Sequence, residues 1–536
     1  MINLFIVGLF LYFFYPEKRK LILNSTPHID LTLKNRFKKD KVPDNLDVII
    51  IGSGMGGLIA AAYLSKKGKK VLVLEQHYTA GGCTHNFVLN NMMFDSGLHY
   101  ISDPVDFGNI LDELGDPNIL IEWEEMCRTD GIFDLITYDG KSYGFTKEPQ
   151  FLGKLIGYFP EKEREFKIYM GLIKEINYYV KFLSILKLLP IAVVEVFITI
   201  FRKFGLFDRK IKIATMDAYS VINGIFQDDK ITKILTGQYG NLGIKPKLCP
   251  FVFHAILVNY YLKGGYYPKG GSRLIAHKLI SAIYNNGSQV LVNAKVKRII
   301  VDDGVCVGVN VKNMNIYAKK IVSAIGILNT KKLLLDDMSP IVCKFRQQCE
   351  KFKPSISHCT LFCVINSTDD FPDYNNWVIN DNSPAFFISF PSEKDSHLRK
   401  KYVGRKSCVV IMEEEYGNYS DFINGDKRCN RKEYQQYKEI KSQQILNVLY
   451  ENYPQLEGKI ESYFLGTPLT NKFYIGSENG ASYGIEHNMD KLDYRVLRPK
   501  TIIKNLYLTG QDITMNGVAG AVGSGILTSY SIMNFL

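Results

Sequence analysis

The sequence lacks the signatures of several common protein classes. None of its ten cysteines forms a C-x-x-C pair, and the closest spacings, Cys343/Cys349 and Cys359/Cys363, are not those of a zinc site. We therefore predict no metal centre. Basic residues outnumber acidic ones by 66 to 54, but no zinc-finger, RNP or basic-zipper pattern carries them. We expect no nucleic-acid partner and assign the excess charge to an anionic membrane surface.

Long uncharged apolar runs are also missing, although spanning a bilayer takes about 20 such residues. Met1–Tyr15 is apolar but short, and the basic residues follow it at Lys18–Lys20. This order predicts a membrane anchor within residues 1–20, with a cleaved signal-like segment as the alternative. Residues 182–207 form a second apolar stretch, interrupted by Pro190 and several charges. They predict an amphipathic membrane-facing segment, or else a buried helix of an inserted domain.

A strand–turn–helix–strand pattern lies near the N-terminus. Leu46–Ile51 is typical of a buried parallel strand, Leu58–Lys67 has a helical pattern, and Lys70–Leu74 forms a second apolar run. A glycine-rich turn, GSGMGG, joins the first strand to the helix. The pattern predicts a Rossmann-type βαβ unit that binds a dinucleotide.

Each element of this unit has a physical role. Gly52 permits the tight turn, Gly54 lets the pyrophosphate approach the backbone, and Gly57 lets the helix pack on the strand. Glu75, 23 residues after Gly52, is placed to accept hydrogen bonds from the adenosine ribose. The N–H groups at the helix start would hold the phosphates.

Features farther along the chain favour FAD over NAD. Gly81 and Gly82 follow the βαβ unit, and a strand near the C-terminus ends at Gly510 and Asp512 before a helical pattern from about 516 to 535. A flavin dinucleotide is long, and Asp512 could accept a hydrogen bond from its ribityl chain. The alternative is an ordinary strand–turn–helix that closes the fold.

The chain resembles the family of phytoene desaturases, carotenoid isomerases and retinol saturases, which are FAD-dependent oxidoreductases. The retinol saturases (all-trans-retinol 13,14-reductases) are the most similar branch, because LEQH, AGGCTH and TGQD match them best. The resemblance rests on five segments: Asp47–Phe87, Phe94–Ile101 (FDSGLHYI), Gly264–Ser272 (GGYYPKGGS), Thr467–Asn471 (TPLTN) and Asn505–Asp512 (NLYLTGQD). Residues 103–250 and 330–460 match no motif of the family.

The resemblance implies the cofactor contacts. The residues expected to contact FAD are Gly52, Gly54, Gly57, Glu75, Gly81, Gly82, Gly510 and Asp512, with Val296 meeting the adenine by its backbone. Val290–Val311, which contains Val296, also predicts strands around a turn at Asp303–Gly304. No second Rossmann pattern is present, so we expect the flavin to be reduced by transiently bound NADPH or NADH, or by another protein.

The resemblance also implies the reaction. Family members act on polyene or isoprenoid lipids drawn from membranes, so we expect saturation of a carbon–carbon double bond at the endoplasmic reticulum or a related endomembrane. A carotenoid cis–trans isomerase or phytoene-type desaturase is the alternative, and a non-catalytic flavin- or lipid-binding membrane protein is a further one. Four residues are candidates for the proton donor: His99, Tyr100, Tyr266 and Tyr267. Aromatic packing against the isoalloxazine or in the core is the favoured interpretation of each, and a trapped water is the alternative donor.

The predicted fold class is α/β, a Rossmann-type FAD-binding domain of the glutathione-reductase kind with an inserted α+β substrate domain. At 536 residues, two or three domains are expected. The FAD domain is discontinuous, built from 41–110, 265–330 and 490–536. Residues 111–264 and 331–489 are expected to form the substrate domain, including the membrane-facing 182–207.

Overall fold

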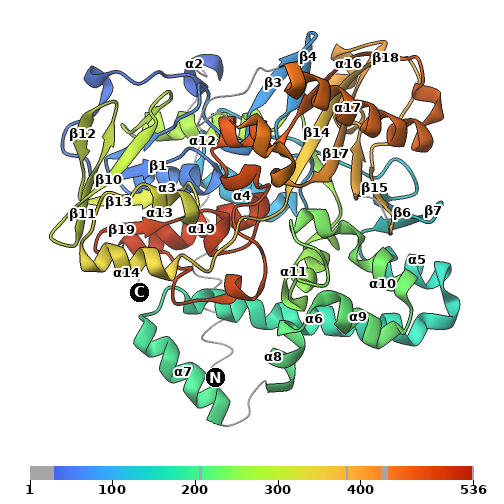
Figure 1. Ribbon diagram of the computed structural model, residues 1–536, viewed down its shortest axis with the longest axis horizontal. Coiled ribbons are helices and arrows are strands. Elements are labelled where there is room, and N and C mark those ends of the chain that lie inside the picture. Colours follow the sequence, from blue (N-terminus) through green and yellow to red (C-terminus); the bar gives the residue numbers. More distant parts are fainter. Residues whose placement is uncertain (1–28, 204–207, 382–383, 424–431, 534–536) are drawn as a thin grey trace.

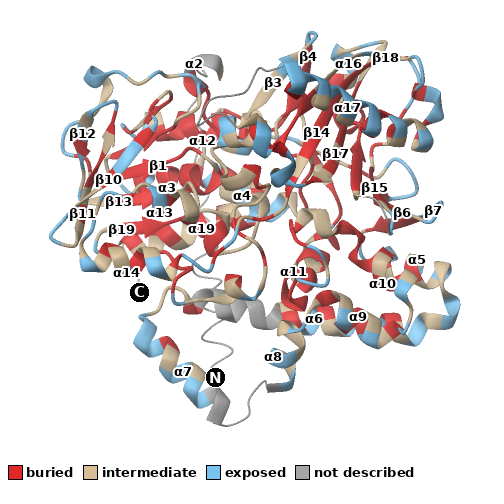
Figure 2. Cartoon of the chain, viewed as in Figure 1, coloured by how far each residue is buried: buried red, intermediate tan, exposed pale blue. Residues whose placement is uncertain are grey.

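A computed structural model describes residues 29–203, 208–381, 384–423 and 432–533. Two large sheets dominate it, one on each side of the molecule in Figure 1, with helices around both. The core residues of both sheets are buried (Figure 2). The predicted membrane anchor within residues 1–20 lies outside the described residues.

The first sheet is parallel and carries the predicted βαβ unit. Its five strands follow the order β19-β13-β1-β2-β9. Their bounds are β1 Val48–Ile51, β2 Val71–Leu74, β9 Gln289–Leu291, β13 Lys320–Ser323 and β19 Leu506–Leu508. All four residues of β1 are buried because the strand is central, with Val48 in register with both Val71 and Lys320. The sheet confirms the predicted α/β fold class.

Helices cover this sheet on both sides, as expected for a parallel sheet. Those packed around it are α2 Ile29–Leu33, α3 Met55–Lys66, α4 Pro104–Leu114, α12 Arg273–Asn285, α13 Ile327–Lys332, α14 Pro340–Gln348 and α19 Gly517–Met533. Helix α3 starts three residues earlier than its pattern predicts, and α19 follows the predicted helix from Gly517 to Met533, where the described residues end. Side chains from residues 334–352 pack in the same core as Ile321 and Leu508.

An antiparallel three-stranded sheet adjoins the first one. It consists of β10 Val296–Asp302, β11 Val305–Val311 and β12 Met314–Tyr317. Asp303 and Gly304, with φ values of 44° and 72°, form the turn between β10 and β11. The strands and the turn predicted within 290–311 are therefore confirmed. Two small antiparallel pairs complete the strands: β3 Asn86–Leu89 with β4 Met92–Asp95, and β5 Trp123–Glu125 with β8 Tyr266–Pro268.

The second large sheet is mainly antiparallel and has seven strands in the order β18-β14-β17-β16-β15-β6-β7. Their bounds are β6 Ile132–Tyr138, β7 Lys141–Thr146, β14 Ser357–Asn366, β15 Asn375–Ile379, β16 Phe386–Ser389, β17 Arg405–Glu414 and β18 Ile460–Gly466. The helices associated with it are α5 Gln150–Tyr158, α6 Glu163–Leu186, α9 Ala218–Phe226, α10 Asp229–Thr236, α11 Phe251–Tyr261, α15 Pro391–Lys394, α16 Ser396–Lys401, α17 Lys432–Asn452 and α18 Pro468–Ile475. The proposed limits of the two domains remain a prediction.

The apolar stretch at 182–207 contains a break at Pro190. Helix α6 ends at Leu186 and α7 Ile191–Lys203 begins directly after the proline. A proline fits the first turn of a helix but not its interior, which explains the break. Helix α7 projects from the lower edge of Figure 1, near α8 Asp208–Thr215. In the part of the chain that the structure describes, no helix has the length and apolar character needed to cross a membrane.

Candidate functional site

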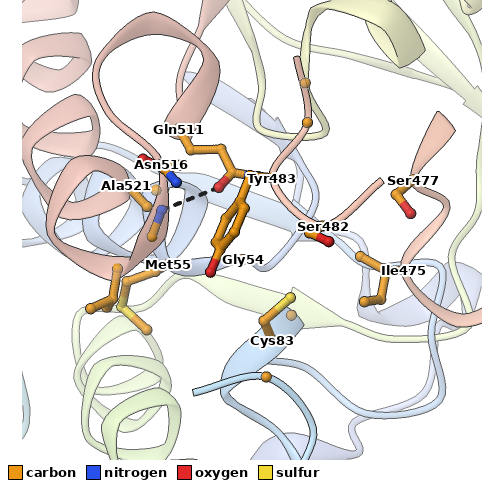
Figure 3. Close-up of a pocket in the computed structure, with 18 of the residues that line it drawn as sticks. Gly54, Met55, Cys83, Ile475, Ser477, Ser482, Tyr483, Gln511, Asn516 and Ala521 are labelled. Atoms are coloured by element: carbon orange, nitrogen blue, oxygen red, sulfur yellow. Dashed lines mark hydrogen bonds between the residues drawn. The ribbon is translucent and has the colours of Figure 1, made fainter. Parts of the chain in front are cut away.

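A large cavity lies between the parallel sheet and the seven-stranded sheet. Its volume is about 1690 Å³, and its wall includes segments that are hundreds of residues apart in the chain. Figure 3 shows Gly54 of the first glycine-rich turn facing the same cavity as Gln511 of the C-terminal motif. Of the predicted cofactor contacts, the cavity wall contains Gly52, Gly54, Glu75, Gly81, Gly82, Val296, Gly510 and Asp512.

The glycines of three separate segments meet at one end of the cavity. A Cβ on Gly82 would lie 2.9 Å from the Gly54 Cα, and one on Gly56 would lie 2.9 Å from the Gly510 Cα. Gly510 has a φ of 104°, which only glycine adopts readily. A Cβ on Gly54, by contrast, meets no protein atom within 4 Å. The backbone at Gly54 thus faces open space in which a ligand can lie against it.

Gly57 does not line the cavity. A Cβ at this position would lie 2.3 Å from the carbonyl oxygen of Gly52. The residue therefore acts through packing, as its predicted role of holding helix α3 against the strand requires. A direct contact between Gly57 and FAD stays a prediction.

Glu75 is buried at the end of β2, and its carboxylate organises the turn. Oε2 accepts hydrogen bonds from the Ser53 backbone N–H at 2.9 Å and from the Ser53 hydroxyl at 2.6 Å. Oε1 accepts one from the His77 backbone N–H at 2.8 Å. A carboxylate has about four acceptor positions, so one remains for a ribose hydroxyl.

Asp512 is held by backbone groups at the opposite side of the glycine cluster. Its Oδ2 accepts from the Ile327 N–H at 2.7 Å, at the start of α13, and its Oδ1 from the Ile485 N–H at 3.3 Å. The positive end of α13 stabilises this negative charge. Lys491 lies behind, and its Nζ donates to the Asp512 carbonyl at 2.6 Å. Burial lowers the pKa of Lys491 to about 7.

The four candidate proton donors separate into two pairs. His99 and Tyr100 line the cavity. Tyr266 and Tyr267 belong to β8 and are not among the lining residues, and the buried Tyr267 hydroxyl donates to the Asp95 carboxylate. Removal from water lowers the pKa of His99 to about 3, so its imidazole is neutral near pH 7. The structure thus places only the first pair where a substrate could reach it.

Sequence reasoning missed several residues of the cavity wall. Asn241, Trp377 and Phe387 lie in the two regions without family motifs, yet all three line the cavity. Asn241 donates a hydrogen bond to the Tyr100 hydroxyl, and the Phe387 ring stacks 6.4 Å from the Tyr100 ring. The only sequence signal for Trp377 and Phe387 was the high aromatic content, which serves cores as well as pockets, and Asn241 had none. Among the described residues, no group of His, Cys, Asp and Glu side chains is arranged to hold a metal ion.

Comparison with known proteins agrees with this geometry. A family model described as an NAD(P)-binding Rossmann-like domain matches residues 50–114. All-trans-retinol 13,14-reductase from Macaca fascicularis is 33% identical over 94% of this chain and 88% of its own length. The chain belongs to the all-trans-retinol 13,14-reductase family.

More distant relatives agree with membership of this oxidoreductase family. Prolycopene isomerase 1 from an Oncidium hybrid cultivar is 24% identical over 91% of this chain and 84% of its own length. Among solved structures, putrescine oxidase bound to putrescine matches with a TM-score of 0.60 and 15% identity, over 91% of this chain and 99% of that one. The chain therefore shares the fold of putrescine oxidase.

The site fits FAD on observations independent of these relatives. Gly54 leaves open space against the backbone, and the glycine cluster brings that space beside the start of α19. The buried Ser477 hydroxyl and the His77 Nε2 both belong to residues of the cavity wall and have no hydrogen-bond partner within the described protein. Buried polar atoms usually have partners, and a bound dinucleotide would supply them.

Proposed function

We propose that this protein is an FAD-dependent oxidoreductase that saturates a carbon–carbon double bond of a polyene or related isoprenoid lipid. The observation that carries the proposal is the single cavity, which joins the glycine cluster to a wall of aromatic and aliphatic side chains. Phe107 and Ile110 of α4, Ile256 and Leu257 of α11, and Phe387 of β16 contribute to that wall. A long apolar substrate could lie there beside the cofactor.

Protein and cofactor have separate tasks in this reaction. Reduced FAD supplies a hydride for one carbon of the double bond. The residues at the glycine cluster would hold the dinucleotide, with Glu75 at the ribose and Asp512 near the ribityl chain. The apolar wall would orient the substrate and exclude water.

Product analysis tests the proposal. Purified protein is expected to show the visible flavin spectrum and, when reduced without oxygen, to convert all-trans-retinol to a product two hydrogens heavier. An unchanged mass with altered geometry would favour the isomerase, which the prolycopene isomerase relatives keep open. Loss of two hydrogens with oxidised flavin would indicate a desaturase. Bound flavin without any conversion of retinol or a carotenoid would indicate a non-catalytic binding protein.

The electron donor is proposed to be a transiently bound NADPH or NADH. Because we assign the cavity to FAD and a lipid, the donor would bind only while the flavin is being reduced. Anaerobic stopped-flow measurement of flavin bleaching with NADPH, NADH or dithionite tests this. Bleaching by dithionite alone would point to a protein donor.

Helix α7 and the positive net charge support a peripheral membrane location, such as the endoplasmic reticulum. Val196 of α7 is 59% exposed, and Val193, Phe197 and Ile200 are at least 40% exposed. Figure 2 shows most of α7 in the colours of exposed and intermediate residues. Leu188, just before α7, lines the cavity. An apolar helix face inserted among lipids would place the cavity next to the source of its substrate.

Vesicle binding tests this location. We expect the protein to sediment with vesicles containing anionic lipid, and Val196→Glu with Phe197→Glu to reduce the bound fraction at least tenfold, since each insertion of a charge opposes burial in lipid. Val403→Glu is the matched control, because Val403 is 83% exposed and follows α16, at the opposite side of the molecule from α7 in Figure 1. Equal binding by both variants would exclude α7 as the contact.

A further inference from the structure

A chain of hydrogen bonds runs from the cavity wall into the seven-stranded sheet. The Tyr100 hydroxyl donates to Asp134 Oδ2 at 2.7 Å and accepts from Asn241 Nδ2 at 2.8 Å. Tyr100 and Asn241 line the cavity, whereas Asp134, on β6, lies behind the wall and is fully buried. The phenol therefore connects the cavity to a buried carboxylate.

The chain continues from Asp134 to a buried ammonium group. Asn375 Nδ2 donates to Asp134 Oδ1 at 2.7 Å, and the Asn375 Oδ1 accepts from Lys394 Nζ. Lys394 is 1% exposed, and its Nζ also donates to the His99 carbonyl at 3.1 Å. The same Nζ lies 5.7 Å from the centre of the Tyr100 ring. A cation and a carboxylate are thus joined through one amide side chain.

At its other end, beyond Tyr100, this series of hydrogen bonds reaches the side of the cavity where we place the cofactor. Asn516 Nδ2 donates to the Asn241 carbonyl, and Asn516 is the residue directly before α19. Asn516 is also one of the cavity residues in Figure 3, beside Gln511. Tyr100 is therefore one residue removed from the segment that follows the TGQD motif, where FAD and a substrate would meet.

A structural role alone does not account for this arrangement. Burying an ammonium and a carboxylate without direct contact between them is costly, and apolar residues of similar size usually stabilise a core at least as well. Buried titratable groups that adjoin a cleft are more often found where proton transfer takes place. The network also leaves one hydroxyl, that of Tyr100, on the cavity wall.

Resting on the reductase function proposed above, we propose that Tyr100 is the catalytic residue that donates the proton to the substrate. Asp134 is the positioning residue that resupplies this proton, and Lys394, acting through Asn375, stabilises the carboxylate that is left.

Saturation of the double bond requires one hydride and one proton. One carbon of the double bond takes the hydride that reduced FAD supplies, and the other forms a bond to the proton of the Tyr100 hydroxyl. When Asp134 is in its acid form, Oδ2 donates to the Tyr100 oxygen, which reverses the 2.7 Å hydrogen bond between them and frees the phenol proton to point into the cavity. As the phenol O–H bond breaks, the phenolate oxygen takes the proton of Asp134 Oδ2. The substrate gains two hydrogens, Tyr100 is neutral again, and Asp134 is a carboxylate. A proton from water returns to Asp134 through Tyr100 after the product leaves.

The ionisation of the buried groups agrees with this sequence. Burial raises the pKa of Asp134 to about 6 and lowers that of Lys394 to about 7. The other titratable groups facing Asp134 are Tyr100 and Tyr261 of α11, and burial raises the pKa of both phenols well above 10. Asp134 and Lys394 are therefore the groups of this network that titrate near neutral pH, and the acid form of Asp134 is the reactive one.

The first test replaces the donor. Tyr100→Phe is expected to bind FAD and be reduced by dithionite like the wild type, while reduction of retinol by the pre-reduced protein slows by about 10²- to 10⁴-fold. Tyr169→Phe is the matched control. Its buried hydroxyl also makes a 2.7 Å hydrogen bond, to His254, but Tyr169 does not line the cavity. The control shows how far the rate of retinol reduction falls when a buried hydroxyl away from the cavity is removed.

The second test follows the pH dependence of the same half-reaction. For the wild type we expect the rate to fall about tenfold per pH unit above the pKa of Asp134. Asp134→Asn should be slow at every pH and lack this inflection. Lys394→Met should move the inflection to higher pH, because removing a cation favours the neutral acid. A merely structural role would lower the rate without moving the inflection.

The outcomes separate the two proposals. If wild-type protein with bound, reducible flavin forms no saturated product, the reductase function fails and this inference fails with it. If the wild type forms product and Tyr100→Phe forms it within threefold of the wild-type rate, only the role of Tyr100 is overturned. An unshifted inflection in Lys394→Met would overturn the role of Lys394 and Asp134.

Discussion

Exchanging single glycines for alanine should separate cofactor binding from folding. Gly54 has a φ of −64°, which alanine adopts freely, and a Cβ there meets no protein atom within 4 Å. Gly54→Ala should therefore leave the free energy of unfolding of the apoprotein unchanged. Its methyl group would instead occupy the space in which we place the pyrophosphate.

The expected loss of affinity follows from contact distances. A phosphate oxygen bonded to a backbone N–H lies about 2.7–3.2 Å from the nitrogen, whereas a methyl group keeps its neighbours at about 3.5–4.0 Å. The phosphate must move back by about 0.5–1 Å and loses at least one hydrogen bond to a charged group, which contributes about 1.5–3 kcal/mol. The Kd for FAD should rise at least tenfold.

Gly57→Ala is predicted to lower the stability of the apoprotein, which Gly54→Ala leaves unchanged. Its Cβ would lie 2.3 Å from the Gly52 carbonyl oxygen, a backbone atom that cannot turn aside. Overpacking of this kind typically costs about 1–3 kcal/mol, so the melting temperature of the apoprotein should fall. Gly157→Ala on α5, where a Cβ meets no atom within 4 Å, is the control for a harmless methyl group.

The assay measures both properties of each variant. Flavin titration of apoprotein, followed by fluorescence quenching, gives Kd, and circular dichroism during heating gives Tm. Unchanged flavin affinity in Gly54→Ala would refute the placement of the pyrophosphate. A Gly57→Ala apoprotein as stable as the wild type would refute the packing role.

Two further predictions concern buried polar groups. Glu75→Gln should raise the Kd for FAD about tenfold, or about 1.4 kcal/mol, because an amide NH₂ would face the N–H and hydroxyl of Ser53; equal affinity in the titration above would contradict this. Burial lowers the pKa of His254 to about 3 and holds that of His487, which accepts the Asn516 N–H, well below its usual value. Just below pH 6.5 only the unfolded chain protonates these two imidazoles. The free energy of unfolding should therefore fall by up to ~1.4 kcal/mol per group and pH unit as the pH drops from 6.5 to 4.5, and Tm should fall with it. His254→Gln should show a smaller fall, and a pH-independent Tm would contradict the account.

Local patterns predicted the dinucleotide half well. Strand β1, helix α3 and strand β2 were predicted within three residues because a buried parallel strand and an alanine-rich helix leave strong short-range signals. The turn at Asp303–Gly304 and the helix break at Pro190 were predicted because backbone conformation there is set by one or two residues.

The seven-stranded sheet left no comparable signal. Its strands come from residues 132–146 and 357–466, and β6 pairs with β15 across more than 200 residues of chain. Pairing partners of this kind depend on where the intervening chain travels, which no short window encodes. Tyr266 and Tyr267 also show the limit of a short motif. Their motif suggested a place at the cavity, but strand β8 holds both residues outside the cavity wall.

By itself the sequence predicted a dinucleotide site at the glycines Gly52–Gly57, with an acid at Glu75, because tight turns and close backbone approach demand particular residues at short spacing. Only the tertiary structure decided that Tyr100 meets Asp134 and, through Asn375, Lys394. These residues come from a loop and three separate elements, β6, β15 and α15. A carboxylate or ammonium acquires an unusual proton affinity only when the folded chain removes it from water.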